Sequence, residues 1–545
     1  MTAQATQVIK ERSRWIALIF ISAAISLVII DGTIVNTIFP KVIEALKLTS
    51  TQVQWVQESY VLVFAALLLV WGSIADRIGR KRLLMIGIAI FIAASVWAGY
   101  STDASGMILA RIVQGFGGSM VLPTTLSLVN ASFQGKERGI AFAVWGATIG
   151  GMVAVGPVLG GWLATDFGTD GWRLAFNINL PIGVIVLAGL WWWAKESKQD
   201  HAEKGIDLVG ALLSVIMFST LVFGLIEGRT YGWWTVNTKN PFVIGDFAWA
   251  TEGISVIPVS LAIAAISTAL FVLYERSRSK AGKSVLLDLD VFKVASFRNG
   301  SIAALIISMG EFGVLFAIPL WLQNVLGLKP LESGTVLLAL AGGAFLASGV
   351  SGAMSGKASP ALLVRMGVAL ELVGVVGVAL FASVEGGFWS IVPWLFVYGV
   401  GIGLATAQLT GVIMVDIPMN KAGQASGSQS TVRQIGSALG IAVLGTMLFS
   451  SVQTSLESKL SDQGIDSTVS SQIVSATVDS AGGAIPGLSA YLQTQHVPVT
   501  VADQVQVSAG EAFTDGTKAA SWAAAGFLTL GLISTINIGA RRKQE

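Results

Sequence analysis

The sequence predicts an all-α polytopic membrane protein, and three observations support this class. Hydrophobic residues make up 53% of the 545 residues and charged residues only 12%, about half the charged share of a typical soluble domain. Apolar runs of roughly 20 residues, long enough to cross a bilayer, recur along the whole chain. Clusters of Lys and Arg separate alternate runs, as expected for loops on the cytoplasmic side.

Fourteen runs are predicted to be transmembrane helices, in groups of six, two and six. The predicted spans lie near 15–38, 53–73, 83–101, 106–127, 139–162, 172–194, 206–226, 253–274, 300–323, 333–353, 361–381, 389–413, 427–449 and 519–539. The grouping predicts an N-terminal six-helix bundle in residues 1–200 and a C-terminal six-helix bundle in residues 299–545. Residues 201–298 would hold an inserted transmembrane hairpin with a cytoplasmic linker. The long outer loop, 450–518, has weak helical patterning.

The stretch GSIADRIGRKR, Gly72 to Arg82, fixes the predicted orientation. It places five charges between two apolar runs, as a short turn in water between two membrane spans would. Lys and Arg are enriched in cytoplasmic loops, so this turn is predicted to lie inside the cell. Other basic clusters fall on the same side, and both termini are therefore predicted to be cytoplasmic. The expected location is the inner or plasma membrane, with the lipid bilayer as partner.

Composition also excludes several classes of function. Lys and Arg number 34 against 32 Asp and Glu, a balance that argues against a nucleic-acid partner. The chain has no Cys, and its two His residues, His201 and His496, lie outside the apolar runs. It also has no phosphate-binding GxxxxGK[ST] motif. No cofactor, no metal site and no enzyme activity are therefore expected, and the protein is expected to be a monomer.

Several motifs together resemble those of the major facilitator superfamily, and in particular its fourteen-span drug:proton antiporters. They are GSIADRIGRKR, RIVQGFGG from Arg111, GPVLGG from Gly156 and IDGTIVNTIFP from Ile30. The resemblance implies two six-helix bundles with an inserted hairpin, which alternately open a central site to either side of the membrane. It also implies multidrug efflux, in which a small-molecule substrate is exchanged for protons.

The turn after the second predicted span has features suited to a conformational latch. Gly72 allows two helices to approach closely, and Gly79 permits a sharp bend. Asp76, at a helix end, can pair with a cation or with the N-terminus of a neighbouring helix. The resemblance implies that this turn, with Arg77 and Arg80, latches the cytoplasmic gate. The alternative is that its basic residues only set the topology.

The fifth predicted span carries glycines at positions where two helices could touch. Gly156 and Gly160 are four residues apart, Gly161 follows directly, and Pro157 interrupts the local hydrogen bonding. Small residues at that spacing let helix backbones come into contact. The resemblance implies a seam on which the two bundles rock and which blocks ion leak. The alternative is helix packing alone.

Four acids lie away from the ends of the predicted spans: Asp31, Glu58, Glu311 and Glu371. A charged group at the centre of a membrane helix costs about 2.5–3.5 kcal/mol, so each acid is a functional candidate. Arg111 is predicted at a depth similar to that of Asp31 and Glu58. An arginine favours the ionised carboxylate and burial opposes it, which could make a proton switch. For Glu58 and Glu371 the alternative is a solvated cavity wall or a structural ion pair.

These acids suggest a proton-coupled antiporter for lipophilic cations. Protonation of Asp31 from outside, together with Glu58 or Glu311, would release a cationic substrate outward. The sequence shows no second embedded Lys or Arg beside Arg111, which favours cationic substrates. Three alternatives remain: a dedicated exporter of one metabolite or lipid, a sodium-coupled carrier, and a non-transporting sensor or scaffold with the same fold.

Overall fold

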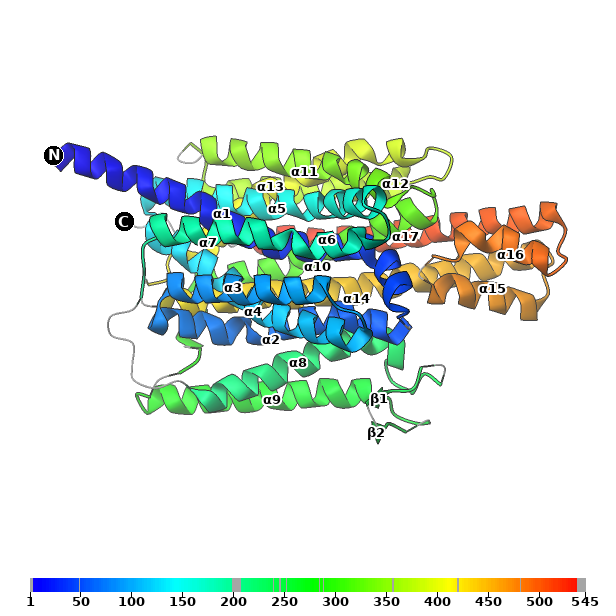
Figure 1. The fold of residues 1–545 in the computed structure, drawn as a ribbon, viewed down its shortest axis with the longest axis horizontal. Helices are drawn as coiled ribbons and strands as arrows, with labels where there is room; N and C mark the ends of the chain where they lie inside the picture. The colour runs from blue at the N-terminus through cyan, green and yellow to red at the C-terminus, as the bar shows by residue number, and fades with distance from the viewer. Residues whose placement is uncertain are drawn as a thin grey trace.

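The chain folds into one bundle of long helices that lie side by side along a common axis (Figure 1). The computed structural model describes residues 3–48, 50–198, 207–238, 240–244, 247–250, 252–283, 285–287, 289–354, 357–418, 421–480 and 482–536. Helix α1 begins and helix α17 ends at the same end of the bundle. A chain that crosses the bundle an even number of times begins and ends on the same side, as these two helix ends do.

Helices cover all six predicted spans of the first bundle, and the helix over the last of these spans is broken. Its helices are α1 (Ala3–Leu46), α2 (Ser50–Ile78), α3 (Arg80–Gly99), α4 (Ala104–Ser132), α5 (Gly135–Asp166), η1 (Gly168–Asp170), α6 (Gly171–Asn177) and α7 (Asn179–Trp193). The break at Ile178 has a local cause in Pro181. Proline lacks an amide proton and its ring clashes with the carbonyl four residues earlier, here that of Asn177. The break leaves Asn179 at the start of α7.

The inserted hairpin and the second predicted bundle follow. Their elements are α8 (Leu208–Tyr231), β1 (Val243–Ile244), β2 (Phe247–Ala248), α9 (Val256–Lys280), η2 (Leu289–Lys293), α10 (Ala295–Asn324), α11 (Pro330–Ala353), α12 (Pro360–Phe381), η3 (Phe388–Ser390), α13 (Val392–Met414), α14 (Ala422–Asp462) and α17 (Val499–Thr535). Strands β1 and β2 pair antiparallel, with Val243 opposite Ala248. The predicted boundary at residues 200 and 201 lies outside the described residues.

The predicted all-α membrane class is confirmed, and each of the fourteen predicted spans overlaps helix. Among the described residues, eleven helices are long and apolar enough to cross a membrane. The remaining predicted spans lie in α2, α5 and α17, which run through the same bundle (Figure 1). The count of fourteen crossings stays a prediction.

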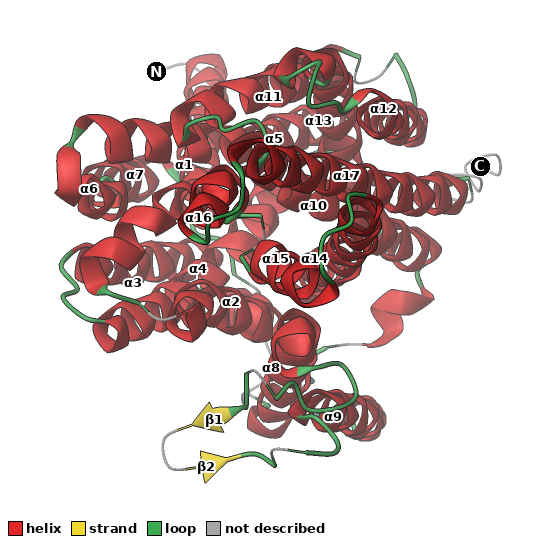
Figure 2. Cartoon of the chain, turned by 90° about the vertical axis from the view of Figure 1, so that its right-hand side faces the viewer, coloured by secondary structure: helices red, strands yellow, loops and turns green. Residues whose placement is uncertain are grey.

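The predicted outer loop is mostly helix. Helices α14 and α17 continue past the ends of their predicted spans, and α15 (Ser467–Asp479), η5 (Ile485–Gly487) and α16 (Leu488–Thr494) pack against them. We call this part, residues 450–518, the outer bundle. In Figure 2 the end of the molecule that carries the outer bundle faces the viewer. Leu456, Ile473, Leu492 and Val505 are among the residues that form its buried core.

The two halves meet along α5 and along α14. Helix α5 packs against α11 and α13, and α14 packs against α2 and α4. Toward the end of α5, Val158 would lie 3.0 Å from a Cβ atom added to Gly334 of α11. Toward its start, Phe142 would lie 3.6 Å from one added to Gly411 of α13. The halves therefore touch near both ends of α5. The hairpin helix α8 packs against both α2 and α14.

Candidate functional site

A buried charged cluster surrounds Asp31 in α1, and we call it the Asp31 cluster. The Asp31 side chain is 0% exposed and that of Arg111, in α4, is 1% exposed. Arg111 Nη1 donates to Asp31 Oδ2 at 2.6 Å. The other carboxylate oxygen accepts from Gln114 Nε2 at 2.7 Å and from Asn179 Nδ2 at 3.1 Å. Both oxygens are thus satisfied, so the carboxylate can stay ionised in the interior.

A second layer of contacts holds the donors of the Asp31 cluster in place. Arg111 Nε donates to the Val56 carbonyl at 3.3 Å, and its guanidinium carbon lies 4.2 Å from the centre of the Tyr60 ring. Asn179 Nδ2 also donates to Ser95 Oγ at 2.8 Å. These partners come from α2, α3, α4 and α7. Five of the helices in the first half, α1 included, therefore meet at one ion pair.

Two glycines bring the helices of the Asp31 cluster close enough for these contacts. A Cβ atom added to Gly115 in α4 would lie 2.6 Å from the Tyr60 carbonyl oxygen in α2. One added to Gly156 in α5 would overlap the side chain of Thr33, two residues after Asp31. Both contacts fall within the first half. Gly156 therefore packs α5 against α1, whereas Val158 of the same motif faces the second half at Gly334.

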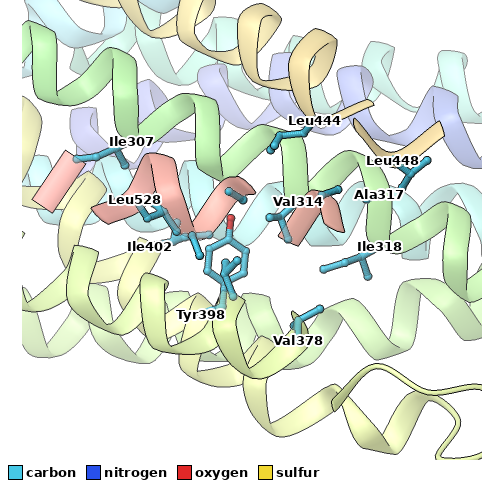
Figure 3. Close-up of a cluster of buried hydrophobic side chains, with 14 of the residues drawn as sticks. Ile307, Val314, Ala317, Ile318, Val378, Tyr398, Ile402, Leu444, Leu448 and Leu528 are labelled. Atoms are coloured by element: carbon cyan, nitrogen blue, oxygen red, sulfur yellow. The ribbon is translucent and has the colours of Figure 1, made fainter. Parts of the chain in front are cut away.

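A second charged cluster lies in the other half, and we call it the Glu311 cluster. Arg433 Nη2 in α14 lies 3.5 Å from Glu311 Oε2 in α10. The Tyr398 hydroxyl in α13 donates to the Glu311 main-chain carbonyl at 3.1 Å, and Figure 3 shows that side chain within the apolar core of this half. Glu371 in α12 is 0% exposed, and neither of its carboxylate oxygens has a hydrogen-bond partner among the described residues.

The Glu311 cluster faces the contact between the two halves. A cavity of about 30 Å³ lies beside it. Its lining includes Ile149 from α5 of the first half, together with Glu311, Phe312, Leu315, Leu340, Ile402, Thr406 and Arg433 from the second half. A group that entered between the halves at this level would meet both Glu311 and Arg433.

The expectation of a single embedded base is wrong, because Arg433 is a second one. Its side chain is 18% exposed, and it lies eleven residues after Ala422, where α14 begins. At 1.5 Å per residue this is about 16 Å into the helix. The Ser, Thr and Gln residues on either side of Arg433 are typical of a loop. The sequence therefore does not indicate that Arg433 lies deep within a helix. Gln114 and Asn179, which donate to Asp31, are not among the predicted site residues. Gln114 could have been found, because it follows Arg111 by three residues and lies on the same face of the helix.

The predicted acids fall into separate places. Asp31 and Arg111 are brought together in the first half, whereas Glu311 and Glu371 lie together in the second half. The side chain of Glu58 in α2 is outside those that the structure describes, as are the side chains of Asp76 and Pro157.

The predicted latch, Gly72 to Arg82, ends in a tight turn that is bound by Glu196, an acid outside this motif. Gly79 has φ of +112°, and a Cβ atom there would lie 2.6 Å from the Glu196 carboxyl carbon. Glu196, just after α7, accepts from the backbone N–H groups of Lys81 at 3.0 Å and Arg82 at 3.1 Å. Its carboxylate therefore binds the positive end of α3. Arg80 donates to the Ser197 hydroxyl at 3.0 Å.

The other predicted gate residues are largely enclosed by the bundle. Gly72, Gly160 and Gly161 are buried, and Arg77 is half-buried. A larger cavity of about 550 Å³ lies near the same turn, between α1, α4 and the segment 193–197. Glu196 forms part of its wall. In the second half, Arg365 donates to the carbonyls of Thr535, the last residue of α17, and of Ile536, which follows it.

Replacing Glu196 with Gln should loosen the start of α3. The amide lacks the charge that interacts with the helix dipole, an interaction worth about 0.3–1 kcal/mol. We expect faster hydrogen exchange at the amides of Lys81 and Arg82, measured by mass spectrometry in detergent. The exposed acid Glu385, in the loop after α12, provides a control, because Glu385→Gln should leave that exchange unchanged. If the amides of Lys81 and Arg82 exchanged equally slowly in both variants, Glu196 would not stabilise the start of α3.

The fold and the two clusters define a polytopic membrane protein with one buried charged cluster in each of its two helical halves. The chain belongs to the Major Facilitator Superfamily, because the model of that family matches residues 21–441. The resemblance of the sequence motifs to this superfamily is thereby confirmed, whereas its fourteen-span drug:proton antiporter branch stays a prediction. Membership indicates a transporter rather than an enzyme, as predicted.

Known proteins of similar sequence are named as transporters or efflux pumps. The "Probable actinorhodin transporter" of Streptomyces coelicolor is 33% identical, over 80% of this chain and 72% of that protein. The "Multidrug efflux pump LfrA" of Mycolicibacterium smegmatis is 28% identical, over 97% of this chain and 96% of that protein. The crystal structure of the human organic anion transporter MFSD10 has a TM-score of 0.59 with 10% identity, covering 96% of this chain and 99% of that one. That structural likeness shows the fold alone.

Proposed function

We propose that this protein is a proton-coupled antiporter that exports lipophilic, cationic drugs or toxic compounds across the cytoplasmic membrane. The observation that carries the proposal is the Asp31 cluster, in which one buried carboxylate pairs with one buried arginine at 2.6 Å. A carboxylate that binds a proton loses its attraction for a cation, so the two ligands compete at one group. Competition of this kind exchanges substrate for protons as the site opens alternately to each side.

The roles of the site residues follow from this competition. Asp31 binds the proton, and Arg111 holds Asp31 ionised until protonation weakens the ion pair. Glu58 contributes a further acid on α2, and Glu311 faces the cavity between the halves. In the gate, Asp76 with Arg77 and Arg80 stabilises the state that is closed to the cytoplasm. Both termini would then be cytoplasmic, and the protein would act as a monomer.

The charge balance supports cationic substrates even with the second arginine. Away from the ends of the predicted spans, four acids, Asp31, Glu58, Glu311 and Glu371, stand against two arginines. The name of the relative LfrA, a multidrug efflux pump, supports a broad substrate range. The actinorhodin relative is named for one compound, which favours a dedicated exporter as the second candidate.

Proton movement in proteoliposomes tests the proposal. The purified protein is reconstituted with an internal pH dye, and tetraphenylphosphonium, ethidium and benzalkonium are added in turn. We expect several of these unrelated cations to cause proton movement against the direction of substrate transport. Sodium replacement distinguishes proton coupling from sodium coupling. A response to only one compound would favour the dedicated exporter, and no proton movement with any compound would contradict proton-coupled antiport.

A further inference from the structure

The second half contains one more embedded acid than embedded base. Away from the helix ends, the charged residues of α10, α11, α12 and α13 are Glu311 and Glu371 alone. Helix α14 adds Arg433 within its membrane-spanning part, and the span 519–535 of α17 adds none. Tyr398 is the other titratable group packed against this set. The charged side chains in the interior of this half are therefore these three, while Arg365, six residues before Glu371 on α12, is bonded to the Thr535 and Ile536 carbonyls.

Glu311 and Arg433 lie where a substrate could reach them. Both line the small cavity, which also touches Ile149 of the other half. Their separation of 3.5 Å is longer than the 2.7–2.9 Å of a strong charge-assisted hydrogen bond. Arg433 is thus held less tightly than Arg111, whose bond to Asp31 is 2.6 Å long. The cavity has room for about one water molecule as it stands, so a cation that widened it between the halves could displace Arg433 from Glu311.

Glu371 is not among the residues that line this cavity. It is fully buried, and its carboxylate oxygens lack hydrogen-bond partners among the described residues. Helix α13 packs closely against it, since a Cβ atom added to Gly401 would lie 2.6 Å from Glu371 Cγ. The Tyr398 hydroxyl donates to a main-chain carbonyl instead of to either carboxylate. Glu311 and Arg433 both interact electrostatically with Glu371.

An ionised Glu371 would be a second negative charge facing one arginine, with no donor of its own. An unpaired, unsolvated carboxylate in an apolar interior is strongly unfavourable, and such a group takes up a proton instead. We infer that Glu371 carries a proton in this state, and that Arg433 switches from Glu311 to Glu371 when a cationic substrate binds Glu311. The inference deepens the proposed function and rests on it.

The exchange balances charge and protons. Before binding, Glu311 is ionised and paired with Arg433, while Glu371 is neutral. The incoming cation takes Glu311 as its counter-ion, and the guanidinium of Arg433 turns to the Glu371 carboxyl. The Glu371 O–H bond breaks, its electron pair stays on the carboxylate, and one proton leaves to water. One positive charge has entered the cluster and one has left, so its net charge is unchanged.

The pH dependence of cation binding tests this exchange. The affinity of the detergent-solubilised protein for tetraphenylphosphonium is measured across pH, and the slope of log Kd against pH gives the protons released per cation. We expect Glu371→Gln to lower the magnitude of that slope by about one proton and to weaken binding at high pH, because Arg433 then lacks its second partner. The amide copies a neutral carboxyl in shape, so the fold should be retained, which the thermal unfolding midpoint checks.

Three further variants make the outcome decisive. Glu311→Gln should weaken cation binding at least about tenfold, and the exposed Glu385→Gln should match the wild type. Asp31→Asn reports on the other half. An unchanged slope in Glu371→Gln, with a slope reduced only in Asp31→Asn, would overturn this inference and leave the proposed antiport standing. A wild-type slope of zero for every cation tried would overturn both.

Discussion

Replacing Asp31 with Asn should abolish export driven by a pH gradient. The amide cannot release a proton or carry the charge that competes for a cation, and it leaves Arg111 buried without its counter-ion. Breaking one partner of a buried ion pair costs about 3–5 kcal/mol, so the unfolding midpoint should also fall. Ethidium efflux from proteoliposomes with an imposed pH gradient measures the transport loss, which should reach the level of protein-free vesicles.

Two controls separate coupling from folding in this experiment. Asp170→Asn removes one partner of the exposed pair with Arg173, worth about 0–1 kcal/mol, and should leave efflux intact. The double variant Asp31→Asn with Arg111→Gln removes both buried charges, so it should recover much of the lost stability. It should remain inactive. Wild-type efflux by the single Asp31 variant would remove Asp31 from the coupling step.

Replacing Gly156 with Ala should disturb the Asp31 cluster from a neighbouring helix. The added methyl group would overlap the Thr33 side chain, and overpacking of this kind costs about 1–3 kcal/mol. Relief requires α1 to move, and a shift of α1 by a few tenths of an ångström would lengthen the hydrogen bonds to Asp31. We expect reduced coupled efflux together with a lower unfolding midpoint, both measured on reconstituted or detergent-solubilised protein.

Gly151 provides a matched control on the same helix. A Cβ atom at Gly151 would meet nothing within 4 Å, so Gly151→Ala should keep wild-type efflux and stability. Replacing Thr33 with Ala removes the hydroxyl that lies nearest to the added methyl group. The double variant Gly156→Ala with Thr33→Ala should therefore regain part of the activity. Identical behaviour of the Gly151 and Gly156 variants would show that the contact between α1 and α5 is not the cause.

The helical elements could be predicted from the sequence because a membrane imposes a simple rule on them. Each crossing needs about 20 apolar residues with all backbone groups bonded internally, and every predicted span overlaps a helix in the structure. The polar residues inside these spans were equally visible. Asp31, Arg111, Glu311 and Glu371 are candidates because an ionisable group in a membrane is costly wherever it lies.

The outer bundle and the place of Arg433 could not be predicted in the same way. Residues 450–518 are polar enough to resemble a loop, yet α14 and α17 extend into them and bury Leu456 and Val505 against α15 and α16. The residues around Arg433 have the composition of a turn. In both places tertiary contacts outweigh the local sequence preference, because packing stabilises a helix more than intrinsic propensity does.

The sequence by itself determined the membrane class, the approximate spans and the identity of the embedded acids, since these depend on length and polarity along one dimension. Only the tertiary structure decided which charges meet. Asp31 and Arg111 are 80 residues apart and bond at 2.6 Å, and Glu311 and Arg433 meet across α10 and α14. Glu371 lies in the same half and has no hydrogen-bond partner for its carboxylate among the described residues. Such pairs depend on helix rotation and on close approach at residues such as Gly115, Gly156 and Gly401, and these are properties of packing in three dimensions.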